Sequence, residues 1–506
     1  MEAAVDIAAR WIEKNATILT CVGIAVLVLL VSTLYLICRR DGERRSPPGP
    51  TRWPLLGSYL NMALLGRENT HRFFPMVHKT YGQVARVYFG HYTMILVSGY
   101  DAIHEAFVKQ EENTIDRPSV LPGIKAIKRL GKGVLFASGE DWVDPGKLLR
   151  SGLATILRSV EYEQILTEEV QMLIDDFSKE GKISFKPGGS IDMAVLSCRY
   201  AAITGKRLTH TDPKLEKVLE YLDDISEYGG TLSPVAMVPL LKYLPFTGKA
   251  YRNLIGAYHG LHAMLMGELE DRKPTYDGGR PKSVIDFFLK EQRNNPDSTL
   301  YSDGNIAVGL EECFTAGGPP IGWTLGWAVI HITGHPSVRT TCQEEIDKVC
   351  GKSRQVRFSD IDYLPNVRAA LYETQRLVTV VPISAPHLTR GDMTLNGFHI
   401  PGQTIIATHI RSAHMDETQW KNPQDFDPSR FLDGGMVKIP PAFMPFGIGP
   451  RKCAGSAIAE REVVMMFASL LKEFTFSCEN TMVYDGIGTV AGVRPPENNI
   501  TVRKRA

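Results

Sequence analysis

One cysteine stands in a loop whose residue types suit metal chemistry. The loop runs from Phe446 to Gly455 and reads Phe-Gly-Ile-Gly-Pro-Arg-Lys-Cys-Ala-Gly. Its glycines and Pro450 favour a tight turn that leaves the backbone open to a flat group. Cys453 has no second cysteine at C-x-x-C spacing, which argues against a zinc site or a redox pair. A single thiolate of this kind suits axial ligation of heme iron.

The neighbours of Cys453 are predicted to favour its anionic form. Arg451 and Lys452 precede it, and a helix is predicted from Ser456 to Phe474. The positive end of that helix dipole and the two cations would all stabilise a thiolate. The alternative is a structural cysteine buried in a turn. We expect Cys453 to be the iron ligand.

The composition indicates a large folded body in a reducing compartment. The chain has 506 residues, 43% of them hydrophobic, and a net charge of +1, which gives no long-range field that would attract nucleic acid. Eight cysteines are scattered without the spacing of a disulfide framework. We therefore expect a reduced, cytosolic catalytic body that does not bind nucleic acid.

An uncharged segment near the N-terminus predicts a membrane anchor. Residues 16–38 carry no charge and are long enough to span a bilayer, and four arginines follow within residues 39–45. This predicts a tail at 1–15, a single-pass anchor at 16–38, a basic and proline-rich hinge at 39–50 and a catalytic domain at 51–506. We expect the endoplasmic reticulum membrane, with the catalytic domain on the cytoplasmic side.

Residue periodicity predicts an α+β body that is predominantly α. Strands are predicted near 84–89, 92–98, 393–400 and 404–408, and helical periodicity dominates from Tyr162 to Val349 and after Ser456. The segment 232–246 is apolar and contains three prolines, which predicts a loop that touches the bilayer surface.

The cysteine loop and two further motifs resemble the cytochrome P450 family. Glu373 and Arg376 are spaced as the Glu-x-x-Arg pair of that family, and Arg430 lies in its later Pro-x-Arg-Phe element. The resemblance runs from about Pro47 to the C-terminus. It implies the cytochrome P450 fold, heme b (iron protoporphyrin IX) with an axial cysteine thiolate, and a buried charge network of Glu373, Arg376 and Arg430.

The resemblance also implies which residues hold the heme. Trp142, His387 and Arg451 occupy family positions that contact the propionates, and Phe446 and Gly455 belong to the signature around Cys453. One position departs from the family pattern. Four residues after Trp142 the family usually has an arginine, and this chain has Gly146. Lys147 and Arg150 are the two possible substitutes, and Pro145 is expected to fit only in the first turn of a helix.

A second departure lies in the helix that crosses the heme in this family, predicted here from Asn305 to His331. Monooxygenases of the family have Ala-Gly, any residue, an acid and a threonine there, and the acid and alcohol supply protons to dioxygen. Here prolines replace both, with neither a side-chain donor nor a backbone N–H. We expect a kink over the iron, formed by the candidate catalytic residues Ala316, Gly317, Gly318, Pro319 and Pro320.

Three functions remain open. The leading hypothesis is an enzyme that converts lipid (fatty-acid) hydroperoxides by O–O homolysis and rearrangement, as an epoxyalcohol synthase, allene oxide synthase or hydroperoxide lyase, without a reductase. In the alternative, water or Thr315 relays protons, and the enzyme is an NADPH-reductase-dependent monooxygenase that hydroxylates or epoxidises an apolar lipid or xenobiotic. The third is a heme-binding protein with degraded catalysis. Residues expected to contact an apolar lipid are Val120, Phe314, Ile321, Val380, Val381 and Ile383.

Overall fold

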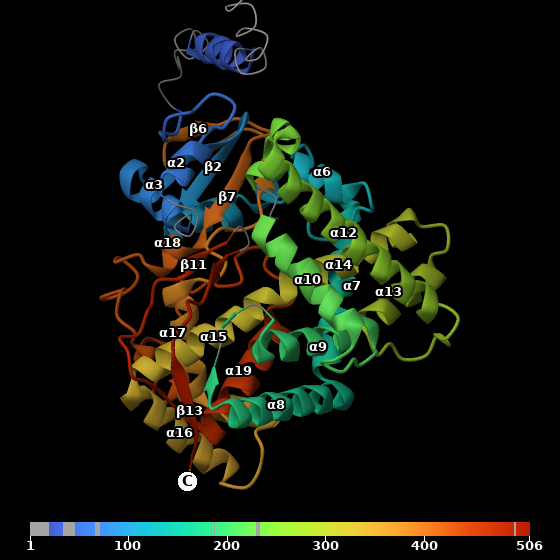
Figure 1. Cartoon of the computed structure of the whole chain (residues 1–506), viewed down its shortest axis with the longest axis vertical. Coiled ribbons are helices and arrows are strands. Elements are labelled where there is room, and N and C mark those ends of the chain that lie inside the picture. Colours follow the sequence, from blue (N-terminus) through green and yellow to red (C-terminus); the bar gives the residue numbers. More distant parts are fainter. Residues whose placement is uncertain are drawn as a thin grey trace, which may run out of the picture.

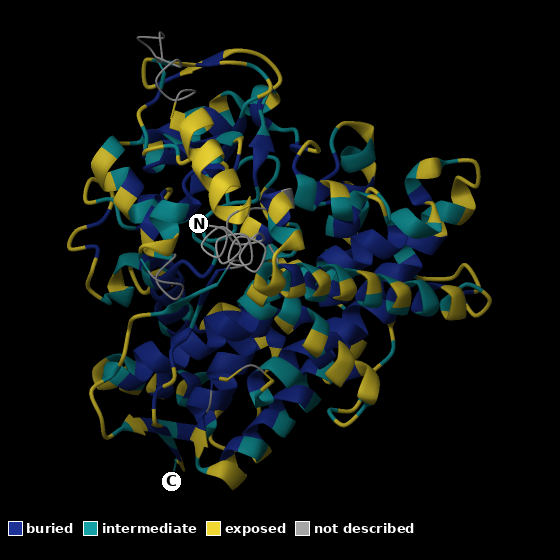
Figure 2. Cartoon of the chain, turned by 45° about the horizontal axis from the view of Figure 1, so that its top comes forward, coloured by how far each residue is buried: buried dark blue, intermediate teal, exposed yellow. Residues whose placement is uncertain are grey.

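Apolar stretches with few charges form the helices at the centre of the molecule. The computed structural model describes residues 20–33, 46–65, 71–183, 185–186, 188–228, 233–489 and 492–505. Two successive helices, α14 (Asp303–Gly317) and α15 (Pro319–Gly334), cross the middle, and α8 (Val160–Glu180), α9 (Ser190–Thr204) and α19 (Ser456–Glu473) pack around them (Figure 1). Figure 2 shows that these inner helices are mostly buried, with exposed residues on the outer faces.

The other helices surround this centre. The remaining α-helices are α2 (Tyr59–Ala63), α3 (Phe73–Tyr81), α4 (Tyr100–His104), α5 (Glu111–Thr114), α6 (Pro122–Lys128), α7 (Glu140–Leu157), α10 (Pro213–Tyr228), α11 (Pro234–Met237), α12 (Pro245–Arg272), α13 (Val284–Asn294), α16 (Pro336–Cys350), α17 (Pro365–Val378) and α18 (Ile410–His414). Other short turns are η2 (Glu105–Lys109), η3 (Pro239–Tyr243), η4 (Thr299–Tyr301), η5 (Phe358–Tyr363) and η6 (Pro428–Phe431).

The strands form small sheets at the edges of the helical body. They are β1 (Val84–Phe89), β2 (Tyr92–Ser98), β3 (Lys182–Ile183), β4 (His387–Leu388), β5 (Met393–Leu395), β6 (Phe398–Ile400), β7 (Ile405–His409), β8 (Leu432–Asp433), β9 (Met436–Val437), β10 (Phe474–Cys478), β11 (Ile487–Gly488), β12 (Val493–Arg494) and β13 (Ile500–Lys504). The α+β architecture, predominantly α, is confirmed.

The largest sheet has four strands in the order β1-β2-β7-β4. Strands β1 and β2 are antiparallel and have the predicted bounds, with Phe89 opposite Tyr92. Strand β2 pairs with β7 in parallel, with Met94 opposite Ile405. The second predicted strand pair is wrong in detail. Residues 393–400 form a hairpin of their own, because Asn396 and Gly397 both adopt positive φ, at 49° and 78°, as a tight hairpin turn requires.

The apolar segment predicted as a loop is helical where it is described. Each of its prolines begins a new element: Pro234 begins α11, Pro239 begins η3 and Pro245 begins α12. A proline in the first turn of a helix removes only an N–H that would lack an intrahelical partner anyway. The three prolines therefore divide the segment into short helical pieces, and Leu232 lies outside the described residues.

Much of the predicted anchor region lies outside the described residues. This holds for the tail, for both ends of the expected span (16–19 and 34–38) and for hinge residues 39–45, whereas residues 20–33 form a helix. Within the described ranges, no helix is long and apolar enough to cross a membrane.

A buried charge network joins α17 to η6 and the chain before it. Glu373 and Arg376 are both 0% exposed, and two guanidinium nitrogens of Arg376 donate to the carboxylate over 2.7 and 2.8 Å. Arg376 also donates to the carbonyl oxygens of His414 (2.9 Å) and Pro423 (2.7 Å). Arg430 donates to Glu373 over 3.2 Å. Each charge therefore has several partners, which a buried ion pair requires.

Replacing Arg376 with alanine should destabilise the fold strongly. Arg376→Ala leaves Glu373 buried with only Arg430 as a cationic partner and removes donors from three carbonyls, those of His414, Pro423 and Asp425, so we expect a loss of about 3–5 kcal/mol in the free energy of unfolding. Denaturant unfolding of the purified protein measures this. Lys438→Ala is the control, because Lys438 pairs with Asp433 while both side chains are 67% exposed. Equal stabilities of the two variants would contradict the assigned role.

Candidate active site

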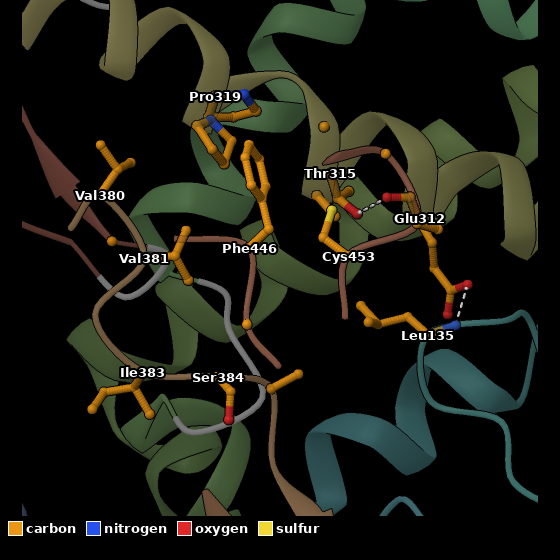
Figure 3. Close-up of a pocket in the computed structure, with 18 of the residues that line it drawn as sticks. Leu135, Glu312, Thr315, Pro319, Val380, Val381, Ile383, Ser384, Phe446 and Cys453 are labelled. Atoms are coloured by element: carbon orange, nitrogen blue, oxygen red, sulfur yellow. Dashed lines mark hydrogen bonds between the residues drawn. The ribbon is translucent and has the colours of Figure 1, made fainter. Parts of the chain in front are cut away.

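The loop before α19 holds Cys453 at the wall of the main cavity, between the central helices and the loop that follows α17. Gly447 and Gly449 adopt positive φ of 76° and 75°, which non-glycine residues rarely do. A Cβ at Gly449 would lie 2.2 Å from the carbonyl oxygen of Phe107. The Cys453 N–H donates to the carbonyl of Phe446 over 3.0 Å and closes the loop. The sulfur therefore faces the cavity from a fixed turn (Figure 3).

Neighbours of Cys453 act on its thiol in the predicted direction, Lys452 among them, but burial acts against them. The residue is exposed toward the cavity, yet burial by the surrounding protein raises the pKa of its thiol. The Gly455 N–H, Arg199 and Lys452 lower that pKa, but burial outweighs them. A bound metal ion would oppose the effect of burial, because a metal deprotonates a coordinating thiol outright.

Cationic side chains gather around Trp142. The Arg451 guanidinium lies 3.8 Å from the centre of the Trp142 ring and donates to the carbonyls of Ile115 (2.9 Å) and Ala137 (2.5 Å). Burial, followed by the nearby charge of Arg117, lowers the pKa of Arg451 to about 8. Burial also lowers the pKa of Arg117 to about 10. Two buried guanidinium groups that repel each other favour an anionic ligand.

His387 completes this group as a neutral ring. Its Nδ1–H donates to the carbonyl of Thr114 over 2.7 Å, and burial holds the pKa of the imidazole well below its usual value. The imidazole of His387 is therefore uncharged near neutral pH. His387, Trp142 and Arg451 all line the cavity, as do Phe446 and Gly455.

Arg150 lies one helical turn after Gly146, the position at which the family usually has an arginine. Arg150 lines the cavity, lies 5.8 Å from the Trp142 ring and donates to the carbonyl of Pro450 over 3.3 Å. Lys147 is absent from the cavity wall and pairs with exposed Asp144 at 3.6 Å. Pro145 sits inside α7, beyond its first turn, so the expectation for its position is wrong. Since α7 tolerates Pro145, the helix continues and carries Arg150 to the cavity.

These features fit a heme. The cavity has a volume of about 890 Å³, with the thiol of Cys453 on its wall and the guanidinium groups of Arg117, Arg150 and Arg451 beside it. Two propionates would supply the anions that this cluster lacks. Cys453 would ligate the iron, and Trp142, His387 and the arginines would hold the propionates.

The predicted kink is a complete break between α14 and α15. Gly318 separates the helices with φ −77° and ψ −74°. Ala316, Gly317, Pro319 and Pro320 line the main cavity, as expected for residues over the iron. Gly318 does not; it is buried and lines a smaller cavity of about 270 Å³ instead. The structure therefore brings four of the five proposed catalytic residues to the site.

The apolar wall comes from fewer residues than predicted. Ile321, Val380, Val381 and Ile383 line the cavity, and Figure 3 shows the last three on one loop facing Phe446. The other two predicted residues, Phe314 and Val120, are not in that wall. Phe314 is fully buried against Tyr200, at 5.9 Å between ring centres, because it lies on the side of α14 that packs against α9. Val120 is 45% exposed and lies outside the wall.

Sequence reasoning missed several polar residues of the wall. Glu311, Glu312 and Arg199 line the cavity, and all three side chains are buried. The acids had a signal: two consecutive glutamates in the middle of an otherwise apolar helix need an explanation. Arg199 had a similar signal within α9, where its neighbours are apolar or small. Glu462 pairs with Arg199 from α19.

Replacing Cys453 with serine should abolish thiolate ligation. The comparison variant is Cys313→Ser, since Cys313 also lines the cavity. We expect Cys453→Ser to lose the ferrous carbon monoxide absorbance of a thiolate heme, because serine offers no thiolate, and Cys313→Ser to keep it. An unchanged spectrum in Cys453→Ser would overturn the assignment of the ligand.

Known proteins match the chain over nearly its whole length. The sequence profile of the family described as Cytochrome P450 matches residues 47–502. The chain is 31% identical over 475 residues to Cytochrome P450 2D6 of Homo sapiens, covering 92% of this chain and 93% of that protein. It is 29% identical over 466 residues to Cytochrome P450 2J3 of Rattus norvegicus, covering 90% and 91%. With a family match over this length and a thiol loop at the expected place, the chain belongs to the cytochrome P450 family.

Proposed function

We propose that this protein is a heme-thiolate monooxygenase that oxidises an apolar lipid with dioxygen and with electrons from an NADPH-dependent reductase. The observation that carries the proposal is a pair of buried acids, Glu311 and Glu312, one turn before the helix break. Similarity to family 2 cytochromes P450 over about nine tenths of the chain supports it. The heme, when bound, supplies the oxygen-activating redox centre.

The Glu312 carboxyl is fixed at the cavity wall. Its Oε2 accepts the N–H groups of Val134 (2.6 Å) and Leu135 (2.8 Å), whereas Oε1 is buried without a partner among the described residues. Figure 3 shows this carboxyl reaching Leu135 from the helix that also carries Thr315. The adjacent Glu311 has a buried Oε2 without a hydrogen bond, 3.8 Å from Nδ1 of His262.

Both acids hold protons near neutral pH. Burial raises the pKa of Glu312 to about 7, although the backbone N–H groups of Leu135 and Val134 oppose it. Burial, followed by the charge of Glu312, raises the pKa of Glu311 to about 9. A carboxyl with a pKa near the working pH is suited to proton transfer, because it both holds and releases a proton readily.

Thr315 extends the pair toward the break. Its hydroxyl lies one turn beyond Glu311 and donates to the Glu311 carbonyl over 3.0 Å. A hydroxyl can accept a proton from one side as it donates on the other. Glu312 and Thr315 thus offer an acid and an alcohol in the turn before Pro319 and Pro320. These two prolines occupy the positions at which family monooxygenases have their acid and threonine. This supports proton delivery by residues of this chain.

The cavity and the surface favour a lipid that arrives from a membrane. Val380, Val381 and Ile383 give the cavity an apolar wall, which suits a hydrocarbon chain or ring system. On the surface, Tyr243 lies in η3 and is 75% exposed, and Phe246 lies in the first turn of α12 and is 91% exposed. Exposed large apolar side chains in one segment are typical of a surface that lies against lipid. We propose that this segment contacts the bilayer.

Replacing Glu312 with glutamine should uncouple the reaction. A glutamine oxygen can still accept the two backbone N–H groups, but the side chain no longer carries an acidic proton. We expect turnover to fall by about a hundredfold or more and hydrogen peroxide release per NADPH to rise, measured with reductase and a panel of medium-chain lipids. Glu216→Gln, at an exposed position of α10, is the control. Unchanged coupling in Glu312→Gln would remove Glu312 from the reaction.

The same acid predicts the pH dependence. Glu312 has a raised pKa of about 7, so its proton-donating form predominates below that pH and disappears above it. Turnover of the wild-type protein should therefore decline as pH rises through about 7, and the decline should be absent in the residual activity of Glu312→Gln. The heme absorbance, recorded at each pH, controls for loss of structure. A wild-type profile that is flat between pH 6 and 8 would count against proton delivery by Glu312.

A second candidate function rests on Pro319 and Pro320. A fatty-acid hydroperoxide brings its own O–O bond and needs no proton from the positions that these prolines occupy. The test mixes the holoprotein with a polyunsaturated fatty-acid hydroperoxide without NADPH or reductase. Loss of conjugated-diene absorbance far faster than with free heme, unchanged in Glu312→Gln and in Pro319→Asp/Pro320→Thr, would favour this reaction. Intact hydroperoxide, with oxidation of a lipid only when NADPH and reductase are present, favours the monooxygenase.

A further inference from the structure

The helix break leaves carbonyl oxygens without their usual donors. In an α-helix each carbonyl accepts the N–H four residues ahead. The carbonyls of Thr315 and Ala316 would take theirs from Pro319 and Pro320, and proline has no N–H. Both oxygens therefore lack a helical hydrogen bond because the residue four positions ahead of each is a proline.

A third carbonyl loses its partner through the geometry of the break. The N–H of Ile321 would reach Gly317 in a regular helix, but it donates to the carbonyl of Gly318 over 3.1 Å instead. The N–H of Gly318 donates back to Phe314 over 3.0 Å. Among the described residues, no backbone or side-chain group donates to the carbonyls of 315, 316 and 317, which we name the kink carbonyls.

The kink carbonyls belong to residues that face the main cavity. Thr315, Ala316 and Gly317 all line it. Gly317 has no side chain, so the atoms that it presents to the cavity are backbone atoms. Figure 3 places Thr315 and Pro319 on the two sides of this turn, beside Phe446 and Cys453. The turn that carries the kink carbonyls is therefore part of the cavity wall.

The surroundings decide which kind of donor suits these acceptors. The side chain of Arg199 lies beside Gly317, where an added Cβ would be 3.6 Å from its Cδ and 3.7 Å from its Nε. This guanidinium pairs with Glu462, and its Nε is buried without a partner. A positive charge already stands at the break, which disfavours a cationic ligand there. A neutral donor, a hydroxyl group, meets no such repulsion.

We propose that the kink carbonyls bind a hydroxyl group of the substrate, so that the enzyme selects lipids that carry an alcohol at one end of an apolar body. This inference deepens the proposed function, since it names the substrate class of the same site. The hydroxyl donates to a kink carbonyl, and its oxygen can accept the unpartnered Nε–H of Arg199. The hydrocarbon part then lies against Val380, Val381 and Ile383. Binding of the polar end fixes which part of the chain remains near Cys453.

The test compares two isomers that differ in hydrogen-bond donation. 1-Decanol and methyl nonyl ether contain the same atoms, but only the alcohol donates a hydrogen bond. Their dissociation constants for the ferric holoprotein are measured by equilibrium dialysis, and the Soret spectrum shows whether the alcohol oxygen binds the iron directly. We expect the alcohol to bind about tenfold more tightly than the ether, which corresponds to about 1.4 kcal/mol, without coordination to the iron.

Variants assign the preference to the break. Pro319→Ala and Pro320→Ala restore the N–H groups that Thr315 and Ala316 lack, so the double variant should lower the alcohol-to-ether preference toward one. Pro320→Ala alone should lower it in part. Pro336→Ala is the matched control, because Pro336 also begins a helix, α16, but lies outside the cavity wall. It should keep the tenfold preference.

Several outcomes would overturn the inference. Equal binding of the two isomers by the wild-type protein would mean that water alone satisfies the kink carbonyls. A preference that persists in Pro320→Ala and in the double variant would assign hydroxyl recognition to another group, as would an alcohol spectrum typical of iron coordination. The measurement needs no turnover. Selective binding without any oxidation would remove the proposed function and leave this inference standing.

Discussion

Two absent amide hydrogens, those of Pro319 and Pro320, determine the form of the central helix and of the cavity beside it. An interior proline costs a helix about 3 kcal/mol, but the first turn of a helix has no intrahelical partner for its N–H groups. The chain avoids most of this cost by ending α14 at Gly317 and starting α15 at Pro319. The unpaired carbonyls follow from this break, and Arg199 lies beside Gly317 at its edge.

Burial shifts the pKa values of the basic and the acidic residues of the cavity in opposite directions. It lowers the pKa of Arg451 to about 8 and raises that of Glu312 to about 7. Charge is therefore disfavoured on both side chains. Heme propionates near Arg117 and Arg451 would stabilise the cationic forms of these arginines. Glu311 lies 3.8 Å from His262, and burial favours the protonated form of both acids.

Local patterns predicted most of the fold. Alternating apolar residues predicted β1 and β2 with the observed bounds, and Pro319 and Pro320 predicted the break, because both signals act over a few residues. The Asn396-Gly397 turn was also readable but was overlooked. The Glu373–Arg376 pair followed from its i, i+3 spacing together with the family resemblance; spacing alone would have fitted any exposed helix.

The cavity was predicted less well, since its wall is assembled from distant segments. Periodicity shows that a helix has an apolar face, but it does not show which face meets the cavity. Phe314 and Glu312 lie two residues apart on α14, and only the acid lines the wall. Val120 was placed by its position in the family pattern, and its side chain is 45% exposed. Whether a helical residue lines the cavity depends on its position around the helix axis, and packing determines which side of the helix faces the cavity.

The parallel pairing of β2 with β7 bears on how the chain assembles. Met94 lies opposite Ile405, so the sheet that begins near the N-terminus is completed by residues made much later. Closing so long a loop costs only slightly more entropy than closing a short one, but non-local pairing slows folding. The intervening helices therefore have time to associate first during synthesis. Until β7 arrives, one edge of β2 lacks its strand, and such an unpaired edge can pair with another chain.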